Sequence, residues 1–157
     1  MKPSYLIATW MGSGLSPKAP GTVGTLAVFI PCLICSSFQP EMFRSFAWIV
    51  FTIATCLIGL WATKETLKNK FFGNSKDPKQ IVIDEVAGFS IAVALCDGSW
   101  QSLTVAFILF RFFDITKFWP VNLAERLKDE KGIMADDIVA GLYSFAILCL
   151  LESFQIL

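Results

Sequence analysis

The chain has 157 residues, enough for one domain and its core, so we expect a single domain over residues 1–157. Apolar residues other than glycine make up 55% of it, and ten glycines add to that share, whereas soluble domains usually contain about 45–50% with glycine included. This excess indicates contact with lipid. The net charge of zero gives no reason to expect a nucleic acid partner, and the lack of histidine excludes every mechanism that depends on imidazole.

The first polar cluster in the chain covers residues 12–25, where glycine and proline are dense and an apolar run follows. This pattern predicts a loop that opens onto a helix, and free N–H groups with a positive dipole at such a helix start suit a phosphate. A purely structural loop is the alternative. The candidate phosphate-binding residues are Lys18, Gly21, Thr22, Gly24 and Thr25.

Two apolar stretches come next, Thr22–Phe38 and Phe43–Ala62. The second is the clearest membrane span, because it is long enough for about 30 Å of hydrocarbon and has tryptophans near its ends. The first is marginal, since it is shorter and contains Pro31. Lys2 precedes only a short apolar run, so we expect no secretory signal peptide.

Lysines crowd the segment after the clearest span, at residues 64–79. The positive-inside rule therefore predicts that this segment lies in the cytoplasm. Counting spans outward from it places residues 1–21 and 114–137 on the same side, and residues 36–42 on the other.

The second polar cluster is Asp84-Glu85, flanked by apolar residues on both sides. Two such carboxylates are costly unless they are paired or bind a metal, although they could simply mark the edge of the membrane.

The stretch Val86–Phe113 consists of two short apolar arms split by a turn signal at residues 97–99. Its arms suit a re-entrant hairpin or two short packed helices better than two full spans. Ile138–Leu157 is the last candidate span. The chain is therefore predicted to be an all-α, membrane-embedded bundle with three to five inserted helices and one possible re-entrant hairpin.

Two further polar clusters flank the segment between the last apolar stretches. Arg111, Asp114 and Lys117 share one arc of a predicted helix, as a salt-bridge ladder or as a metal ligand beside two phosphate clamps. Asp136 and Asp137 precede the last span, where aspartates often cap a helix, but one would suffice for that role.

All four clusters fall on the predicted cytoplasmic side, which favours one shared site. Hard cations such as Mg²⁺ prefer oxygen ligands and bridge carboxylates to phosphates, so metal-assisted hydrolysis is the predicted reaction class. A small transporter or ion pathway and a soluble helical domain are the alternatives. The expected metal ligands are Asp84, Glu85, Asp114, Asp136 and Asp137, three or four of which would bind directly. The expected phosphate clamps are Arg111 and Lys117.

At these clusters the chain resembles the bacterial phosphatidylglycerophosphatase A family. The matching stretches, in that family's order, are GSGLSPKAPGTVGT, DPKQIVIDEVAGF, FRFFDITKFWP and GIMADDIVAGLYS. The resemblance implies a Mg²⁺-dependent phosphatase whose substrate is a phospholipid in the membrane. It would convert phosphatidylglycerophosphate to phosphatidylglycerol at the cytoplasmic face of the bacterial inner membrane.

Overall fold

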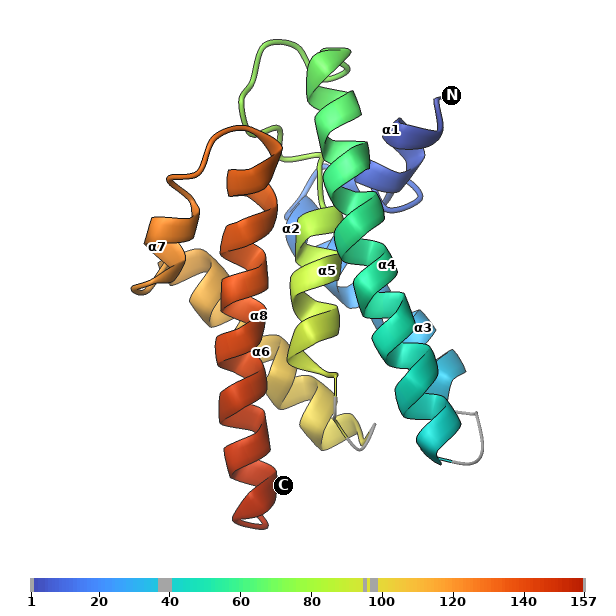
Figure 1. Ribbon diagram of the computed structural model, residues 1–157, viewed down its shortest axis with the longest axis vertical. Helices are drawn as coiled ribbons and strands as arrows, with labels where there is room; N and C mark the ends of the chain where they lie inside the picture. Colours follow the sequence, from blue (N-terminus) through green and yellow to red (C-terminus); the bar gives the residue numbers. More distant parts are fainter. Residues whose placement is uncertain (1, 37–40, 95, 97–98, 157) are drawn as a thin grey trace.

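The computed structural model describes residues 2–36, 41–94, 96 and 99–156, and within them it contains helices and no strands. In Figure 1, α5 lies between α4 and α8 and contacts both, while α6 packs against α8 and α3 against α4. The elements in chain order are α1 (Pro3–Ala8), the 3₁₀ turn η1 (Ser13–Leu15), α2 (Pro20–Ala27), α3 (Phe29–Ser36), α4 (Glu41–Lys68), α5 (Ile83–Ala92), α6 (Trp100–Thr116), α7 (Val121–Ala124) and α8 (Glu130–Ser153). The all-α prediction is confirmed.

Within the described residues, two helices are long and apolar enough to cross a membrane, α4 over Ser45–Lys68 and α8 over Glu130–Ser153. They coincide with the two strongest predicted spans, which are compatible with membrane association, but the predicted boundaries at Ala62 and Ile138 are wrong as helix boundaries. Helix α4 continues beyond Ala62 and α8 begins before Ile138, because an apolar window stops at the first charges whereas lysine and glutamate remain good helix formers. Each span reaches roughly 36 Å at about 1.5 Å per residue.

The marginal stretch Thr22–Phe38 forms two short helices, α2 and α3, which meet at Val28. Pro31 stands near the start of α3 and lacks the N–H that would bond to the carbonyl of Ala27 in a continuous helix. Proline is tolerated in a first helical turn, so the chain starts a new helix there. The end of the predicted stretch, at residues 37 and 38, lies outside the described residues.

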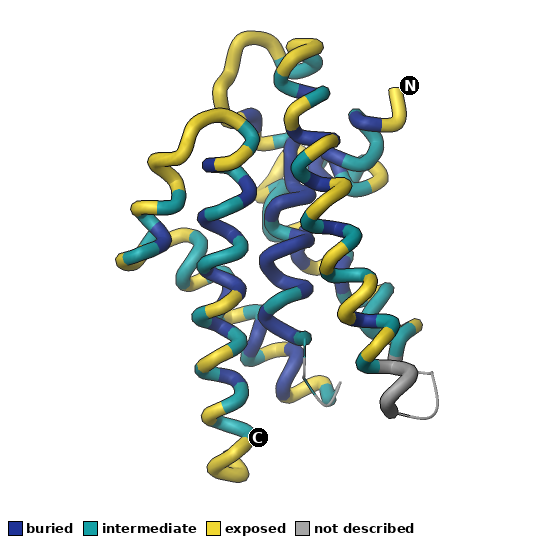
Figure 2. The backbone as a smooth tube through the Cα atoms, viewed as in Figure 1, coloured by how far each residue is buried: buried dark blue, intermediate teal, exposed yellow. Residues whose placement is uncertain are grey.

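The stretch Val86–Phe113 forms the two short helices α5 and α6, and most of its predicted turn lies outside the described residues. Helix α5 is the centre of the core: nearly all of its residues are buried, and Figure 2 shows it as the dark trace between α4 and α8. A helix that is apolar on all sides needs neighbours on all sides. The other helices therefore surround α5.

The contact between α5 and α8 is made backbone to backbone at two glycines. A Cβ on Gly141 of α8 would overlap the carbonyl oxygen of Gly88, and a Cβ on Gly88 would overlap the carbonyl oxygen of Asp137. Small residues let helix backbones approach in this way in membrane proteins. The two helices are therefore held at a spacing that a larger side chain would not permit.

The outer face of α4 is apolar and exposed. Large apolar side chains recur along it at helical spacing, and each is 45–64% exposed. An apolar face of this length is typical of a surface that meets lipid or another protein. Its members include Phe46, Ile49, Val50, Ile53, Leu57 and Ile58.

We expect Gly141→Ala to lower the free energy of unfolding by about 1–3 kcal/mol, because the added methyl group overpacks the contact with Gly88. Thermal unfolding of the purified protein in detergent measures the change. Ala146→Val adds bulk to the same helix at an exposed position and should change stability by less than about 0.5 kcal/mol. Equal melting temperatures for the two variants would contradict the close α5–α8 approach.

Candidate active site

A polar pocket of about 430 Å³ lies where α2, α5, α6 and α8 meet. Four segments that are distant in the sequence supply its walls: the loop into α2, the segment before α5 with its first turn, the end of α6, and the second and third turns of α8. Its charged lining residues are Asp77, Lys79, Asp84, Glu85, Arg111, Asp114, Lys117, Asp136 and Asp137. The four predicted clusters therefore reach one pocket.

Three carboxylates form the acidic side of the pocket. Asp84 and Glu85 stand in the first turn of α5, and Asp137 reaches them from α8. One oxygen from each residue lies within 4.8 Å of the other two. Asp84 is 7% exposed and Asp137 is 3% exposed, so water screens their mutual repulsion poorly.

The acidic side has free oxygen atoms that would suit a cation. Asp84 Oδ1 accepts a hydrogen bond from the backbone N–H of Glu85 at 3.1 Å. Glu85 Oε2 and Asp137 Oδ1 are buried and have no hydrogen-bond partner among the described residues. Unpartnered buried carboxylate oxygens are costly, and a hard divalent cation binds to oxygen ligands of this kind. The residues present therefore fit Mg²⁺.

Two cations and two further aspartates form the opposite side. Arg111 Nη1 lies 2.6 Å from Asp114 Oδ2, in ion-pair contact but without hydrogen-bond geometry. Lys117 Nζ donates a hydrogen bond to Asp114 Oδ1 at 3.3 Å and another to Asp136 Oδ2. The predicted ladder is thus present, and it extends from α6 to α8 through Lys117.

Lys117 follows the last residue of α6 and has a left-handed backbone conformation, with φ of 48°. Burial opposes its positive charge, but the carboxylates of Asp137, Asp136 and Asp114 outweigh that effect and raise the pKa of its amine. Lys117 is therefore held as a fixed cation in the wall of the pocket.

The interpretation of Asp136 and Asp137 as helix caps is wrong. Helix α8 begins at Glu130, so both aspartates lie inside it and cannot bond to the free N–H groups at its start. Their burial must be compensated otherwise, by Lys117 for Asp136. Asp137 lies in the acidic cluster and its Oδ1 has no partner among the described residues, so a bound cation would neutralise its charge.

The start of α2 borders the acidic side. A Cβ on Gly21 would overlap Glu85 Oε1, so a larger residue here would force the Glu85 side chain to move. Thr22 also lines the pocket. The backbone N–H groups in this first turn have no helical partner and can bind an anion.

The other three residues predicted in this loop do not line the pocket. Lys18 is exposed to solvent. Gly24 is buried against Val82, and the Thr25 hydroxyl donates a hydrogen bond to the carbonyl of Gly21 at 2.9 Å. The contacts of Gly24 and Thr25 therefore stabilise the fold and do not reach the pocket.

Two residues that line the pocket were missed from the sequence, Asp77 and Lys79. Charge alone does not distinguish them from the neighbouring lysines of the segment at residues 64–79. The available signals are their closeness to Asp84 in the chain and their place in the matching stretch DPKQIVIDEVAGF.

The fold and the pocket together define a class of protein. It is an all-helical enzyme with two apolar helices that are compatible with membrane association, and its pocket is lined by both acidic and basic side chains. The family model described as Phosphatidylglycerophosphatase A matches residues 6–152. The chain therefore belongs to the phosphatidylglycerophosphatase A family and is a phosphatase, as the four motifs indicated.

Curated relatives agree with this assignment. The chain is 38% identical to "Phosphatidylglycerophosphatase A" of Escherichia coli (strain K12), over 93% of this chain and 81% of the relative. It is 34% identical to the Haemophilus influenzae protein of the same name, over 94% and 88% of the two chains. It is also 36% identical to "Putative phosphatidylinositol-3-phosphatase" of Bacteroides thetaiotaomicron, over 94% of both chains. A search of the solved structures found no significant match.

Lys117→Met should lower the free energy of unfolding by roughly 1–3 kcal/mol, because it leaves Asp114 and Asp136 without their shared cation. Thermal unfolding of the purified protein in detergent measures the change. The matched change Lys128→Met, at an exposed position, should have little effect; an equal loss in both variants would contradict the bridging role.

Proposed function

We propose that this phosphatase removes the terminal phosphate of phosphatidylglycerophosphate and leaves phosphatidylglycerol. The single observation that carries the proposal is the pocket itself, in which three clustered carboxylates face an arginine and a lysine. Such a site binds a phosphate between a cation held by the carboxylates and the two basic side chains. The family and two of its relatives, which are named for this reaction, support the choice of substrate.

Asp84, Glu85 and Asp137 would hold Mg²⁺, because their oxygens are close together and two of those oxygens are unpartnered. When bound, Mg²⁺ supplies charge stabilisation at the phosphate and makes a coordinated water more acidic. Asp114 and Asp136, expected from the sequence to belong to the same ligand pool, are assigned here to orienting Arg111 and Lys117. The ligand pool thus divides into three ligands and two positioning residues.

The basic side chains would bind the phosphate oxygens from the opposite wall. The guanidinium of Arg111 is planar, and its buried Nε has no hydrogen-bond partner among the described residues. Lys117 carries a fixed positive charge, and the free N–H groups at the start of α2 add donors from a third direction. These groups would stabilise the charge that grows on the phosphate oxygens during the reaction.

Hydrolysis requires that a water lose its proton while the glycerol oxygen gains one. The chain has no histidine, so a carboxylate of the pocket that does not bind the metal is suited to accept the first proton and to return it to the glycerol oxygen.

The pocket would face the cytoplasm at the inner membrane. The lysine-rich segment at residues 64–79 follows α4 directly, and Lys79 of that segment lines the pocket. The positive-inside rule then supports placing the pocket on the cytoplasmic side. A substrate anchored by its acyl chains would present its head group at this level.

A transporter and a soluble domain were the alternatives from the sequence. The polar clusters meet in one pocket rather than along the length of α4 and α8, which supports hydrolysis over transport. The exposed apolar face of α4 supports a membrane location. A phosphorylated inositol lipid is a second candidate substrate, because one relative of equal length carries that activity in its name.

The first test measures phosphate release from phosphatidylglycerophosphate in mixed micelles, with Mg²⁺ and with excess chelator. We expect activity that the chelator abolishes and that Asp137→Asn reduces by at least about 10²-fold, because an amide is a poorer metal ligand. Asp129→Asn, at an exposed position before α8, is the matched control. Activity that resists both chelator and Asp137→Asn would contradict the metal assignment, and faster release from phosphatidylinositol 3-phosphate would favour the second substrate.

Arg111→Lys should leave the fold intact and reduce turnover by about 10²–10³-fold. Lysine keeps the positive charge beside Asp114, so the ion pair is retained, but it cannot reproduce the planar fork. Turnover and melting temperature are compared with those of Arg126→Lys, the same change at an exposed arginine. Near-normal turnover in Arg111→Lys would show that this arginine has only a structural role.

A further inference from the structure

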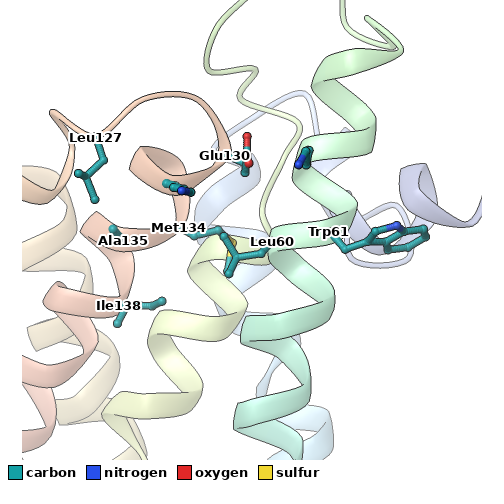
Figure 3. A pocket seen from close by; sticks show the side chains of 9 residues that line it. Leu60, Trp61, Leu127, Glu130, Met134, Ala135 and Ile138 are labelled. Carbon is teal, nitrogen blue, oxygen red and sulfur yellow. The ribbon is translucent and has the colours of Figure 1, made fainter.

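A second cavity, of about 580 Å³, lies between α4 and α8 and shares no lining residue with the polar pocket. Its surface is almost entirely apolar. In Figure 3, Leu60 of α4 and Met134 of α8 face each other across it, and Ala135 and Ile138 lie on the α8 side. We call this cavity the α4–α8 groove.

The groove and the polar pocket are on different sides of α8. Ile133 and Asp137 line the polar pocket, whereas Met134 and Ile138 line the groove. The end of Met134 also packs near Gly59 of α4, so the base of the groove is closed. A molecule in the groove therefore does not occupy the phosphatase site.

Charge is confined to one end of the groove. Lys64 follows Leu60 by one turn on α4, and Lys131 precedes Met134 by about one turn on α8. Glu130 is the third charged lining residue, so the end carries a net positive charge. Neither lysine forms an ion pair with another described residue. Beyond the lysines, α8 lines the groove with Met134, Ala135 and Ile138, and Ile138 lies seven residues, or roughly 10 Å, along the helix from Lys131.

This order of charge and apolar surface matches an anionic phospholipid. If the phosphate lies at the two lysines, an acyl chain can lie along the apolar part of the groove. The chain would then run parallel to α4 and α8, which are long enough to cross a membrane. The outer wall of the groove includes Trp61, which is 48% exposed and continues the apolar face of α4. Aromatic side chains and lysines at helix ends are the usual contacts of lipid head-group regions.

We propose that the α4–α8 groove binds one anionic phospholipid, with an acyl chain against Leu60, Met134 and Ile138 and the head-group phosphate between Lys64 and Lys131. The site is separate from the one that hydrolyses the substrate. The ligand is recognised by the net negative charge of its head group and by its acyl chain, and it needs no terminal phosphate.

The test compares phosphatidylserine with phosphatidylcholine of identical acyl chains, because only the first carries a net charge and neither is a substrate or product of the proposed reaction. Lipid retained by the full chain in detergent is measured by native mass spectrometry. We expect one phosphatidylserine bound in preference to phosphatidylcholine. Replacing both lysines, as Lys64→Ala with Lys131→Ala, should weaken the binding of phosphatidylserine about fivefold for each lysine removed. The control replaces two exposed lysines outside the groove, Lys68→Ala with Lys76→Ala.

A second pair of variants tests the apolar part. Ala135→Phe fills the groove and should remove the bound lipid, while Ala146→Phe adds the same ring at an exposed position of α8 and should not. Equal binding of the two lipids that is unchanged by the lysine replacements would overturn the head-group assignment. A dimer that Ala135→Phe separates, with no lipid bound, would assign the groove to a second copy of the chain and overturn the proposal.

Discussion

The close contact between α5 and α8 is the constraint on which the site depends. Gly88 and Gly141 bring the two backbones together, and the carbonyl of Asp137 lies where a side chain on Gly88 would stand. This spacing places the acidic residues at the start of α5 beside Asp137, so that three carboxylate oxygens come within 4.8 Å of one another. Without that contact the same residues would be isolated acidic groups on separate helices.

Bringing so many carboxylates together in a largely apolar chain is electrostatically unfavourable, and the fold compensates for only part of the cost. Arg111 and Lys117 neutralise Asp114 and Asp136, whereas oxygens of Glu85 and Asp137 remain buried without partners. Incomplete compensation of this kind is typical of functional sites, where a ligand completes the set of contacts. Both halves of the pocket retain buried atoms without hydrogen-bond partners among the described residues: oxygens of Glu85 and Asp137 that would bind a metal, and nitrogens of Arg111 that would bind the phosphate.

The same helices also organise the chain relative to lipid. Helix α5 is surrounded by α2, α4, α6 and α8, while α4 and α8 expose apolar faces. Both cavities are lined by residues from the N-terminal part of α8, and the α4–α8 groove is also lined by residues near the C-terminal end of α4. One side of α8 contributes to the polar pocket and another to the α4–α8 groove. The proposed catalytic site and the proposed lipid site therefore share this helix without sharing a residue.

The amino-acid sequence alone determined the helical class, the two long apolar helices and the clusters that carry the chemistry, because composition and local periodicity report these directly. Only the tertiary structure decided how the clusters combine. Asp84 and Asp137 are far apart in the chain, and their meeting depends on a helix spacing that two glycines permit. The same packing brings Asp77 and Lys79 to the pocket and leaves Lys18 and Thr25 outside it. Local sequence patterns do not indicate which of these residues line the pocket, because that depends on which faces of distant helices pack together.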